Sequence, residues 1–594
     1  MKRKLFLPIL CLQLSILIIL AAGPSAARAE FVTSTDFPLI GDPGAREGGV
    51  LRYAIREYPA TFRIYGPNAN TTFISMMGSL VYQRLVSIHP ETLEFIPMLA
   101  EAWEIGGDRK TFRFRLDPEA RWADGRPVTP EDVLFSWELA TNPAIKDPYT
   151  TELFSTFERP VIEDPHTVKI VAKTLHWRNF MFVGANLDIL PAHTYRGKEY
   201  LETFQWQIPN GSGPYALGEF RKGQTIEFQR RKDFWARDRR AFRGTHNFDT
   251  IRFIIIRDPN LELEKFKKGE LDFYGVGVAR RWIEELTPEK IHAMSMGWIQ
   301  KRKIYTRAPS GINGLAFNTR RKPFDDVRVR KALALLYDRD KLLEKLFYNE
   351  YLPMDSYFPG SVFENPGNEK ITYNPEKARE LLSEAGWAGR NSRGIREKDG
   401  QTLSFTLIYG SQENERHLTV YQQDLRRAGI EMNLKLTNFA TMWKLIDDRS
   451  FDVANVAWSG MIFPNPEFSF HSRYADQSQT NNITGFKNQR VDQILEAYPG
   501  MFDLNERIRA LREMDGLIHR EHPYMLNWYA PFSRVLYWNR FGMPPFYLSK
   551  MGDMDDILTL WWFDPEKDRA LKEAMNTDKP LPVGPVEIKY WLER

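Results

Sequence analysis

The first 29 residues have the three-part composition of a secretory signal peptide, so the rest of the chain is expected to fold after export. A basic run at 2–4 is followed by an apolar stretch at 5–22. The triplet Ala27-Arg28-Ala29 then places small residues at the two positions that a signal peptidase reads. We expect cleavage after Ala29 and a periplasmic protein, with an uncleaved membrane anchor of similar length as the alternative.

The only cysteine of the chain lies inside this leader. Leu10 precedes Cys11 at the position where a lipoprotein signal has a small residue, so no lipid anchor is expected. Without Cys11 the exported chain has no disulfide and no thiolate metal ligand. The leader carries four basic residues and no acidic residue, so the 81 basic groups fall to 77 and balance the 77 acidic groups. This balance removes the electrostatic argument for a nucleic-acid partner.

Beyond the leader, the hydrophobic pattern predicts an α/β chain of short strands and medium helices, without the regular alternation of a barrel. Thr129 followed by Pro130 is a helix-start signal, and Asn374 and Gly386 bracket a second helix in the same way. Apolar alternation or short apolar runs predict strands at 48–59, 111–122, 166–173, 250–258 and 402–410. Helical periodicity predicts helices at 129–140, 325–347, 374–387 and the first part of 416–436, whose last part is expected to be a strand.

The tetrad Gly211-Ser212-Gly213-Pro214 contains the residue types of a phosphate loop or of a nucleophile site. Both sites need a helix directly after the glycines, and a nucleophile elbow also needs a strand before the serine. The residues that follow instead alternate as two strands, 215–220 and 224–231, with Gly223 between them. We therefore predict a structural role for the tetrad, as the tight entry into a β-hairpin.

Several segments in a fixed order, including "FRFRLDPEARWADGRPVTPEDVLFSWE" and "FNTRRKPFDDVRVRKALALLYDRDKL", together resemble one family, although each alone is a weak signal. The segments are 81–105, 112–138, 211–235, 247–273, 317–342, 374–387 and 480–495. The family is the large extracellular solute-binding proteins that serve peptide importers of the ATP-binding-cassette (ABC) type, the dipeptide/oligopeptide-binding class. The stretches "LFYNEYLPMDSYF" and "TLWWFDPEK" are similar to its Yej-type subgroup, which binds oligopeptides, microcin and murein peptides.

The resemblance implies a two-lobed periplasmic-binding-protein fold of type II, in its large peptide-binding class. A first lobe would hold residues 30–68, 206–308 and 540–594, an extra subdomain 69–205, and a second lobe 309–539. The ligand would lie between the lobes, which close over it. The resemblance also implies the partners: a short peptide, and an inner-membrane ABC permease with its ATPase subunits. We expect a monomer with no metal, no cofactor and no nucleic acid.

The segment 451–461 is the first part of the predicted ligand site. Alternation over 451–458 predicts a strand, which the following serine and glycine end. In the family, the end of this strand offers main-chain N–H and C=O groups to an extended ligand, and such pairing gives affinity for any peptide backbone. The resemblance therefore assigns to the site Ala457, Trp458, Ser459, Gly460 and Met461.

Other positions of the predicted site come from matching segments of the family. Trp443 lies in a segment that lines the family's cleft, with core packing as the alternative. Arg449 precedes the strand and has the fork geometry to hold a ligand carboxylate, with a solvated surface arginine as the alternative. Asn482 matches a position that approaches the ligand in relatives. Glu57 and Tyr58 lie in the turn after the opening strand, where relatives also contact ligand.

The sequence departs from the family at Met461. Peptide-binding relatives usually place an aspartate three residues after the strand-end tryptophan, where it pairs with the α-ammonium of the ligand. Yej-type members resemble this sequence in lacking that aspartate. Our hypothesis is that Glu57 supplies the missing carboxylate, with Glu467 as the alternative. The competing explanation is a ligand with no free amine at that spot, such as a modified, branched or cell-wall-derived peptide.

Two other function classes stay open from the residues alone. The same fold with an oligosaccharide, opine or siderophore-like ligand is the first, because tryptophan-rich clefts also suit sugars. A secreted hydrolase is the more distant one, since carboxylate pairs neither support nor exclude it. The segment "HREHP" at 519–523 lacks metalloprotease spacing. We expect a binding protein rather than an enzyme.

Overall fold

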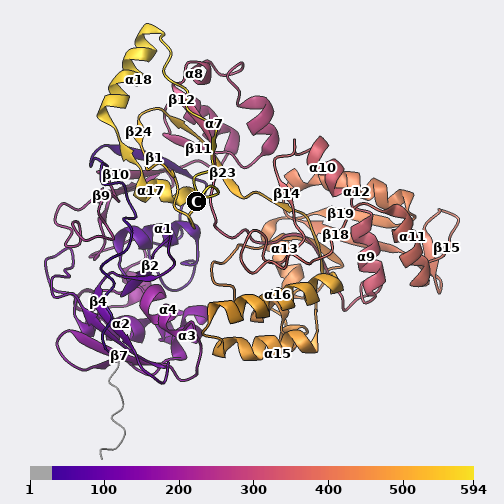
Figure 1. Cartoon of the computed structure of the whole chain (residues 1–594), viewed down its shortest axis with the longest axis horizontal. Helices are drawn as coiled ribbons and strands as arrows, with labels where there is room; N and C mark the ends of the chain where they lie inside the picture. The colour runs from indigo at the N-terminus through magenta and orange to yellow at the C-terminus, as the bar shows by residue number, and fades with distance from the viewer. Residues whose placement is uncertain (1–29) are drawn as a thin grey trace, which may run out of the picture.

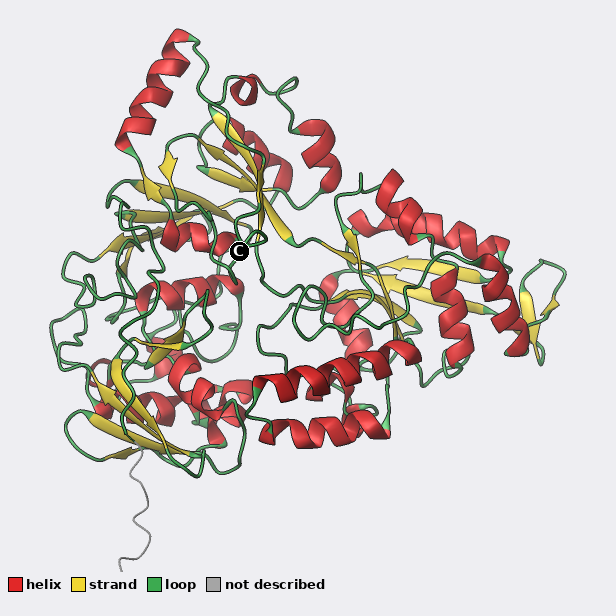
Figure 2. Ribbon diagram, viewed as in Figure 1, coloured by secondary structure: helices red, strands yellow, loops and turns green. Residues whose placement is uncertain are grey.

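The computed structural model describes residues 30–594, and the predicted signal peptide lies outside them. Figure 1 shows two bodies that face each other, one holding the start and the end of the chain and the other its middle part. Figure 2 shows sheets covered by helices in both bodies. We call these bodies the first and the second lobe and define each by its sheets. The mixed α/β architecture confirms the predicted fold class.

The first lobe is built on two four-stranded sheets. One sheet has the order β1-β10-β9-β8, with β1 parallel to β10 and the other neighbours antiparallel. The other has the order β11-β23-β12-β26 and so includes strands from the end of the chain. The strand bounds are β1 Val50–Ile55, β8 Tyr215–Arg221, β9 Thr225–Arg230, β10 Thr250–Ile255, β11 Phe273–Gly275, β12 Ile299–Tyr305, β23 Phe532–Trp538 and β26 Glu587–Ile588. The helices α7 (Pro259–Lys267) and α18 (Pro565–Thr577) pack on the second of these sheets.

The Gly-Ser-Gly-Pro tetrad enters the β8–β9 hairpin, as the sequence predicts. The hairpin turns at Gly223, whose φ of +73° suits a residue without a Cβ. A Cβ on Gly213 would lie 2.6 Å from the Leu80 carbonyl oxygen, so the backbone packs directly on another segment. Ser212 is fully buried, and its Oγ accepts a hydrogen bond from the Gln83 N–H at 2.9 Å. This serine holds two segments together and is closed to solvent.

An extra subdomain lies between β1 and β8 in the sequence and is built on the sheet β4-β5-β7-β6. The strand bounds are β4 Ala100–Ile105, β5 Thr111–Leu116, β6 Val161–Ile162 and β7 Thr167–Val171. Along β5 the residues alternate between buried and half-buried, which places Phe112 and Phe114 in the core. The helix α2 (Pro130–Ala140) begins at the predicted cap, where Asp132 Oδ2 accepts from the Thr129 N–H at 2.8 Å. The apolar core of this subdomain is continuous with that of the first lobe.

The second lobe is built on a five-stranded sheet with the order β19-β18-β20-β13-β21. The strand bounds are β13 Asn313–Phe317, β18 Ser404–Tyr409, β19 Glu431–Leu436, β20 Val453–Ala457 and β21 Tyr524–Leu526. The strands β18, β19 and β20 run parallel, and β13 runs antiparallel to β20 and β21. The first residue of β13, Asn313, therefore pairs with the last residue of β20, Ala457. The carboxyl ends of the parallel strands and the start of β13 meet at the same end of the sheet. Ligands of open α/β sheets bind outside the carboxyl ends of the strands.

Helices cover both faces of this sheet. Leu315 and Phe317 of β13 pack with the helices of one face, whereas Ala316 packs with those of the other, because side chains alternate along a strand. The helices of the first face are α9 Val327–Leu335, α11 Pro375–Glu384 and α12 Glu415–Arg427. Those of the second face are α13 Phe439–Asp447, α15 Gln489–Ala497 and α16 Leu504–Glu521. The sheet of the second lobe is thus held between two layers of packed helices.

The helical region predicted at 325–347 consists of two helices, α9 and α10 (Arg339–Lys345). The break falls at Asp338, whose side chain accepts from the Lys341 N–H at 3.2 Å and so caps α10. Amphipathic periodicity continues across this break, which explains why the pattern alone predicts one long element.

Two crossovers join the lobes. The first, 306–312, links β12 to β13, and the second, 530–531, links β22 (Trp528–Tyr529) to β23. Because β23 pairs along its whole length with β12, residues 532–538 belong to a sheet of the first lobe. The sequence-based boundary at 539 is therefore too late, and we place it before Phe532. Nothing in the composition of this apolar strand marks the change of lobe.

The apolar cores of the two lobes are separate clusters. Those of the first lobe are drawn from residues up to 304 and from 535 onward, and those of the second lobe from 312–528. Among residues 30–594, no helix combines the length and the apolar character needed to cross a membrane. The same residues contain no cluster of three or more histidine, cysteine or acidic side chains arranged to hold a metal ion.

Candidate functional site

The end of β20 and the first crossover meet in close backbone contact. The Trp458 N–H donates to the Ile312 carbonyl oxygen at 2.8 Å, which extends the pairing of β20 and β13 past the strand ends. A Cβ on Gly311 would lie 1.5 Å from the Trp458 carbonyl oxygen, and a Cβ on Gly460 would lie 1.9 Å from the Pro309 carbonyl oxygen. No larger residue fits at either position without moving backbone.

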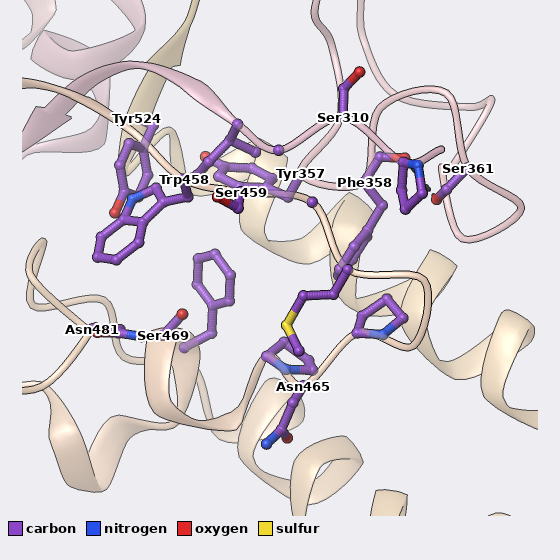
Figure 3. A pocket seen from close by; sticks show the side chains of 18 residues that line it. Ser310, Tyr357, Phe358, Ser361, Trp458, Ser459, Asn465, Ser469, Asn481 and Tyr524 are labelled. Carbon is purple, nitrogen blue, oxygen red and sulfur yellow. Dashed lines mark hydrogen bonds between the residues drawn. The ribbon is translucent and has the colours of Figure 1, made fainter. Parts of the chain in front are cut away.

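This contact forms one wall of a cavity of about 370 Å³, which we call the β20 cavity (Figure 3). Its rings are Tyr357, Phe358, Trp458, Phe470 and Tyr524. Its neutral polar side chains are Ser310, Ser361, Ser459, Asn465, Ser469 and Asn481. The other lining residues are glycines, prolines, Ile312 and Met461, so none of the eighteen carries a charge. The cavity suits a ligand part that is uncharged but can form hydrogen bonds.

The edge of β20 beside this cavity is open. β18 pairs with β20 only at Val453 and Ala454, and β13 occupies the opposite edge. From Ala457 to Ser459 the edge that faces away from β13 therefore meets no strand in the described part of the chain. An extended ligand backbone can pair with such an edge, because the exposed N–H and C=O groups are those of a strand without a neighbour.

A second cavity of about 360 Å³, which we call the inter-lobe cavity, is lined by both lobes. Its second-lobe residues belong to the opposite face of the sheet from the β20 cavity. Unlike the β20 cavity it is rich in charge. The charged residues are Arg280, Arg281 and Glu285 from the first lobe and Glu413 and Arg416 from the second. Glu285 pairs with both first-lobe arginines, at 2.9 and 3.4 Å.

Two buried polar atoms of the inter-lobe cavity, His417 Nε2 and Asn527 Oδ1, have no hydrogen-bond partner among the described residues. Burial lowers the pKa of His417 to about 4, so its imidazole is neutral at pH 7. Asn527 Nδ2 donates to Asn313 Oδ1 at 3.2 Å, which ties the residue after β21 to the start of β13. An unpaired buried polar atom costs about 1–3 kcal/mol, so each of these two atoms is a candidate contact for a ligand or a water molecule.

The predicted residues at the end of β20 lie beside the cavity, and ligand contact by them stays a prediction. Trp458, Ser459, Gly460 and Met461 line it, and the preceding Ala457 is exposed. Trp443 packs edge-on against Trp458, with ring centroids 5.4 Å apart, and so holds this ring in place. Its role in ligand binding stays a prediction.

Arg449 and Asn482 hold the loop that follows β20. Arg449 Nη2 donates to the Thr480 hydroxyl at 2.8 Å and to the Gln477 carbonyl oxygen at 2.5 Å, and burial lowers the pKa of its guanidinium. The buried amide of Asn482 makes two bonds through Nδ2 and two through Oδ1, all within the loop. Its neighbour Asn481 lines the β20 cavity instead. Ligand contact by Arg449 and Asn482 stays a prediction.

Glu57 and Tyr58 lie in the turn after β1, in the first lobe. Glu57 is exposed and lines neither cavity. Tyr58 packs against Phe62 and Trp206, with ring centroids 6.4 and 5.7 Å away, and its buried hydroxyl has no partner among the described residues. Ligand contact by either residue stays a prediction.

A buried charge triad joins the lobes beside the crossovers. Glu350, in the loop after α10, accepts from Lys303 Nζ of β12 at 2.9 Å and from Arg534 Nη2 of β23 at 3.0 Å. All three residues are less than one-tenth exposed. The ring of Phe532 lies 4.8 and 5.0 Å from the two cationic groups and shields them from water. The triad therefore fixes the second lobe to the two strands from which the crossovers leave.

A second inter-lobe contact, which we call the clasp, joins residues 177 and 178 of the extra subdomain to the second lobe. The partners are Phe463, Pro499 and Arg507. The Trp177 N–H donates to the Pro499 carbonyl oxygen at 2.9 Å, and the Arg507 guanidinium lies 4.1 Å from the centre of the Trp177 ring. Arg178 is almost fully buried and donates to the Phe463 carbonyl oxygen. Burial lowers the pKa of Arg178 to about 10. Phe463 lies two residues after Met461, so the clasp grips the loop that lines the cavity.

Sequence reasoning missed three parts of the site: the crossover 309–312, the ring pair Tyr357 and Phe358, and the inter-lobe arginines. One signal was available for the first of them, because serine-glycine occurs in both "PSGI" and "WSGM", the two segments that meet. The other two parts carry no local pattern.

Comparisons with known proteins agree with this architecture. The sequence profile of the bacterial extracellular solute-binding proteins, family 5, matches residues 94–481. A probable peptide-binding protein of Agrobacterium fabrum is 26% identical over 544 residues, which cover 84% of this chain and 87% of the relative. The oligopeptide-binding protein AppA of Bacillus subtilis, solved with a nonapeptide, superposes with a TM-score of 0.69 at 21% identity, covering 87% of this chain and 99% of AppA.

A third comparison adds a different ligand chemistry to the same fold. NikA of Brucella suis, solved with Fe(III)-EDTA, superposes with a TM-score of 0.71 at 20% identity and covers 86% of this chain and 99% of NikA. These structural likenesses show a type II periplasmic-binding-protein fold. The profile match spans more than half of the sequence, and the chain therefore belongs to the bacterial extracellular solute-binding proteins, family 5.

Proposed function

We propose that this protein is the substrate-binding component of an ABC-type importer and that it captures a short peptide between its two lobes. The observation that carries the proposal is the open backbone edge from Ala457 to Ser459 beside the β20 cavity. Strand addition at such an edge recognises a peptide backbone whatever its side chains are. The nonapeptide complex of AppA and the name of the Agrobacterium relative support the same ligand class.

The proposal includes the partners and the location. The protein acts as a periplasmic monomer and hands its ligand to an inner-membrane permease with ATPase subunits. It binds the ligand without chemical change, as expected for a family of binding proteins. The ligand is a peptide that is modified or derived from the cell wall. Cleavage of the leader after Ala29 releases the protein from the membrane.

Peptide binding is expected to stabilise the protein and to draw the lobes together. A ligand that binds only the native state adds about 2.7 kcal/mol at 100 times its dissociation constant. Thermal denaturation with a pool of tri- to pentapeptides, half of them N-acetylated, measures the stabilisation. Small-angle scattering is expected to show a smaller radius of gyration, and mass spectrometry to recover the bound peptides uncut. A melting temperature unchanged by every member of the pool would contradict the proposal.

A second candidate is the same capture mechanism with a non-peptide solute. The NikA comparison shows this fold around a metal chelate, and an uncharged aromatic cavity also suits sugars. A panel of oligosaccharides and ferric chelates in the same thermal assay separates the two candidates. Stabilisation by a panel member and by no peptide would transfer the proposal to that solute.

The exported protein is expected to begin at Glu30. Intact-mass measurement of the periplasmic fraction checks this, because loss of residues 1–29 removes a defined mass. The variant Ala29→Lys places a long charged side chain at the cleavage site and is expected to leave the leader attached. Recovery of wild-type protein that still begins at Met1 would show that the leader is a permanent anchor.

A further inference from the structure

The β20 cavity is free of charge, whereas the inter-lobe cavity holds three arginines and two glutamates. A peptide with free ends carries an ammonium at one end and a carboxylate at the other. The arginines of the inter-lobe cavity suit a carboxylate. The β20 cavity offers no carboxylate to an ammonium, although it lies beside the open strand edge that would hold the ligand backbone.

Carboxylates close in sequence to the cavity lining are engaged elsewhere, and Asp355, two residues before Tyr357, pairs with Arg339 at 2.7 Å. Glu467, next to the lining residue Pro466, forms an ion pair with Arg473 and does not line the cavity. Glu364 Oε2 accepts from the Gly360 N–H at 2.7 Å and also stays outside the lining. Arg178, the cation beside the cavity loop, donates to a backbone carbonyl oxygen and so brings no carboxylate to the cavity. An ammonium in the β20 cavity would therefore have no charged partner there.

Neutral hydrogen-bonding groups are available in its place. No hydrogen bond between described residues involves the side chains of Ser310, Ser459, Asn465, Ser469 and Asn481. They can donate to a carbonyl oxygen and accept from an N–H, which are the two groups of an amide. An amide-capped end is satisfied by such groups, whereas an ammonium there would lose hydration that neutral acceptors replace only in part, because no carboxylate balances its charge.

We propose, on the basis of the proposed function, that the natural ligand is a peptide whose α-amino group is capped by an uncharged acyl group, and that this cap occupies the β20 cavity. Met461 lines the cavity at the position where peptide-binding relatives usually have the aspartate that pairs with the ligand amine. The exposed Glu57 of the first lobe does not line the cavity, and in this proposal it does not select the ligand.

The test is a competition on the mature, full-length protein between pairs of synthetic tri- to pentapeptides that differ only by an N-acetyl group. Retained peptides are identified by mass spectrometry, and the best pair is measured by calorimetric titration. The acetylated twin is expected to bind at least about tenfold more tightly than the free amine. Equal or tighter binding of the free amine would overturn this inference and leave the proposed function standing. Retention of no peptide of either kind would overturn the proposed function and the inference with it.

Variants at position 461 give a matched control. Met461→Asp places a carboxylate at the cavity and is expected to reverse the preference, so that the free amine binds about tenfold more tightly than its acetylated twin. Asparagine has nearly the same shape as aspartate but no charge, so Met461→Asn is expected to keep the preference for the acetylated peptide. Glu57→Gln is expected to change neither affinity by more than about twofold. A selective loss of free-amine binding in Glu57→Gln would overturn the inference in favour of Glu57 as the amine partner.

Discussion

Replacing Glu350 with alanine is expected to lower the free energy of unfolding by about 3–5 kcal/mol. The change leaves Lys303 and Arg534 with no carboxylate, at positions where each is less than one-tenth exposed. Two like charges then remain side by side without hydration, which costs far more than the loss of one hydrogen bond. Urea denaturation followed by circular dichroism measures the loss.

An exposed acid in the preceding helix is the control for this prediction. Glu344 pairs with Lys345 at 2.5 Å, but more than half of each side chain is exposed. Glu344→Ala is therefore expected to change stability by no more than about 0.5 kcal/mol. The combined replacement Lys303→Met, Glu350→Leu and Arg534→Met removes all three charges and is expected to recover most of the lost stability. A loss below about 1 kcal/mol in Glu350→Ala would show that the triad is hydrated in solution.

Alanine at Gly311 or Gly460 is expected to destabilise the protein by about 1–3 kcal/mol and to weaken peptide binding more than tenfold. The new Cβ would lie 1.5 Å from the Trp458 carbonyl oxygen in the first case and 1.9 Å from the Pro309 carbonyl oxygen in the second. Only a separation of the two backbones relieves either contact, and that separation moves the open edge of β20. Calorimetric titration with the best peptide and urea denaturation measure the two effects.

Gly107 provides the matched control, because an added Cβ there meets no atom within 4 Å and its φ is not in the left-handed region. Gly107→Ala is expected to leave binding unchanged and stability within about 0.5 kcal/mol. Normal peptide affinity in Gly311→Ala and Gly460→Ala would mean that the crossing of the two backbones does not shape the site.

The parts of the fold that the sequence predicts are those determined locally. The β8–β9 hairpin, the Thr129 start of α2 and the end of α11 at Gly386, whose φ is +91°, all depend on residues a few positions apart. The strand β20 also forms where its own residues predict a strand, although its first four residues are all buried and do not alternate. Local patterns of this kind survive packing because the tertiary contacts act in the same direction.

The candidate site is less predictable, because it is assembled from distant segments. Residues 309–312 and 458–461 are separated by well over a hundred residues and share one wall of the β20 cavity. Tyr348 and Asn349, just before Glu350, both have φ values of +56°, a conformation that is uncommon for tyrosine and that no glycine marks in the sequence. Arg449 and Asn482 resemble ligand residues by position, and in the structure most of their polar atoms bond to a loop, so ligand contact by either stays a prediction. Which way a side chain turns is decided by packing that the sequence pattern does not record.

The clasp gives the two lobes a second connection, apart from the crossovers. Trp177 and Arg178 of the extra subdomain donate to the Pro499 and Phe463 carbonyl oxygens of the second lobe, and Figure 1 shows α16 reaching toward α3 (Pro148–Ser155) and α4 (Asn179–Met181). A rotation that separates the lobes about the crossovers must therefore break these two hydrogen bonds. The energy needed for that separation depends on the clasp as well as on the flexibility of residues 306–312 and 530–531.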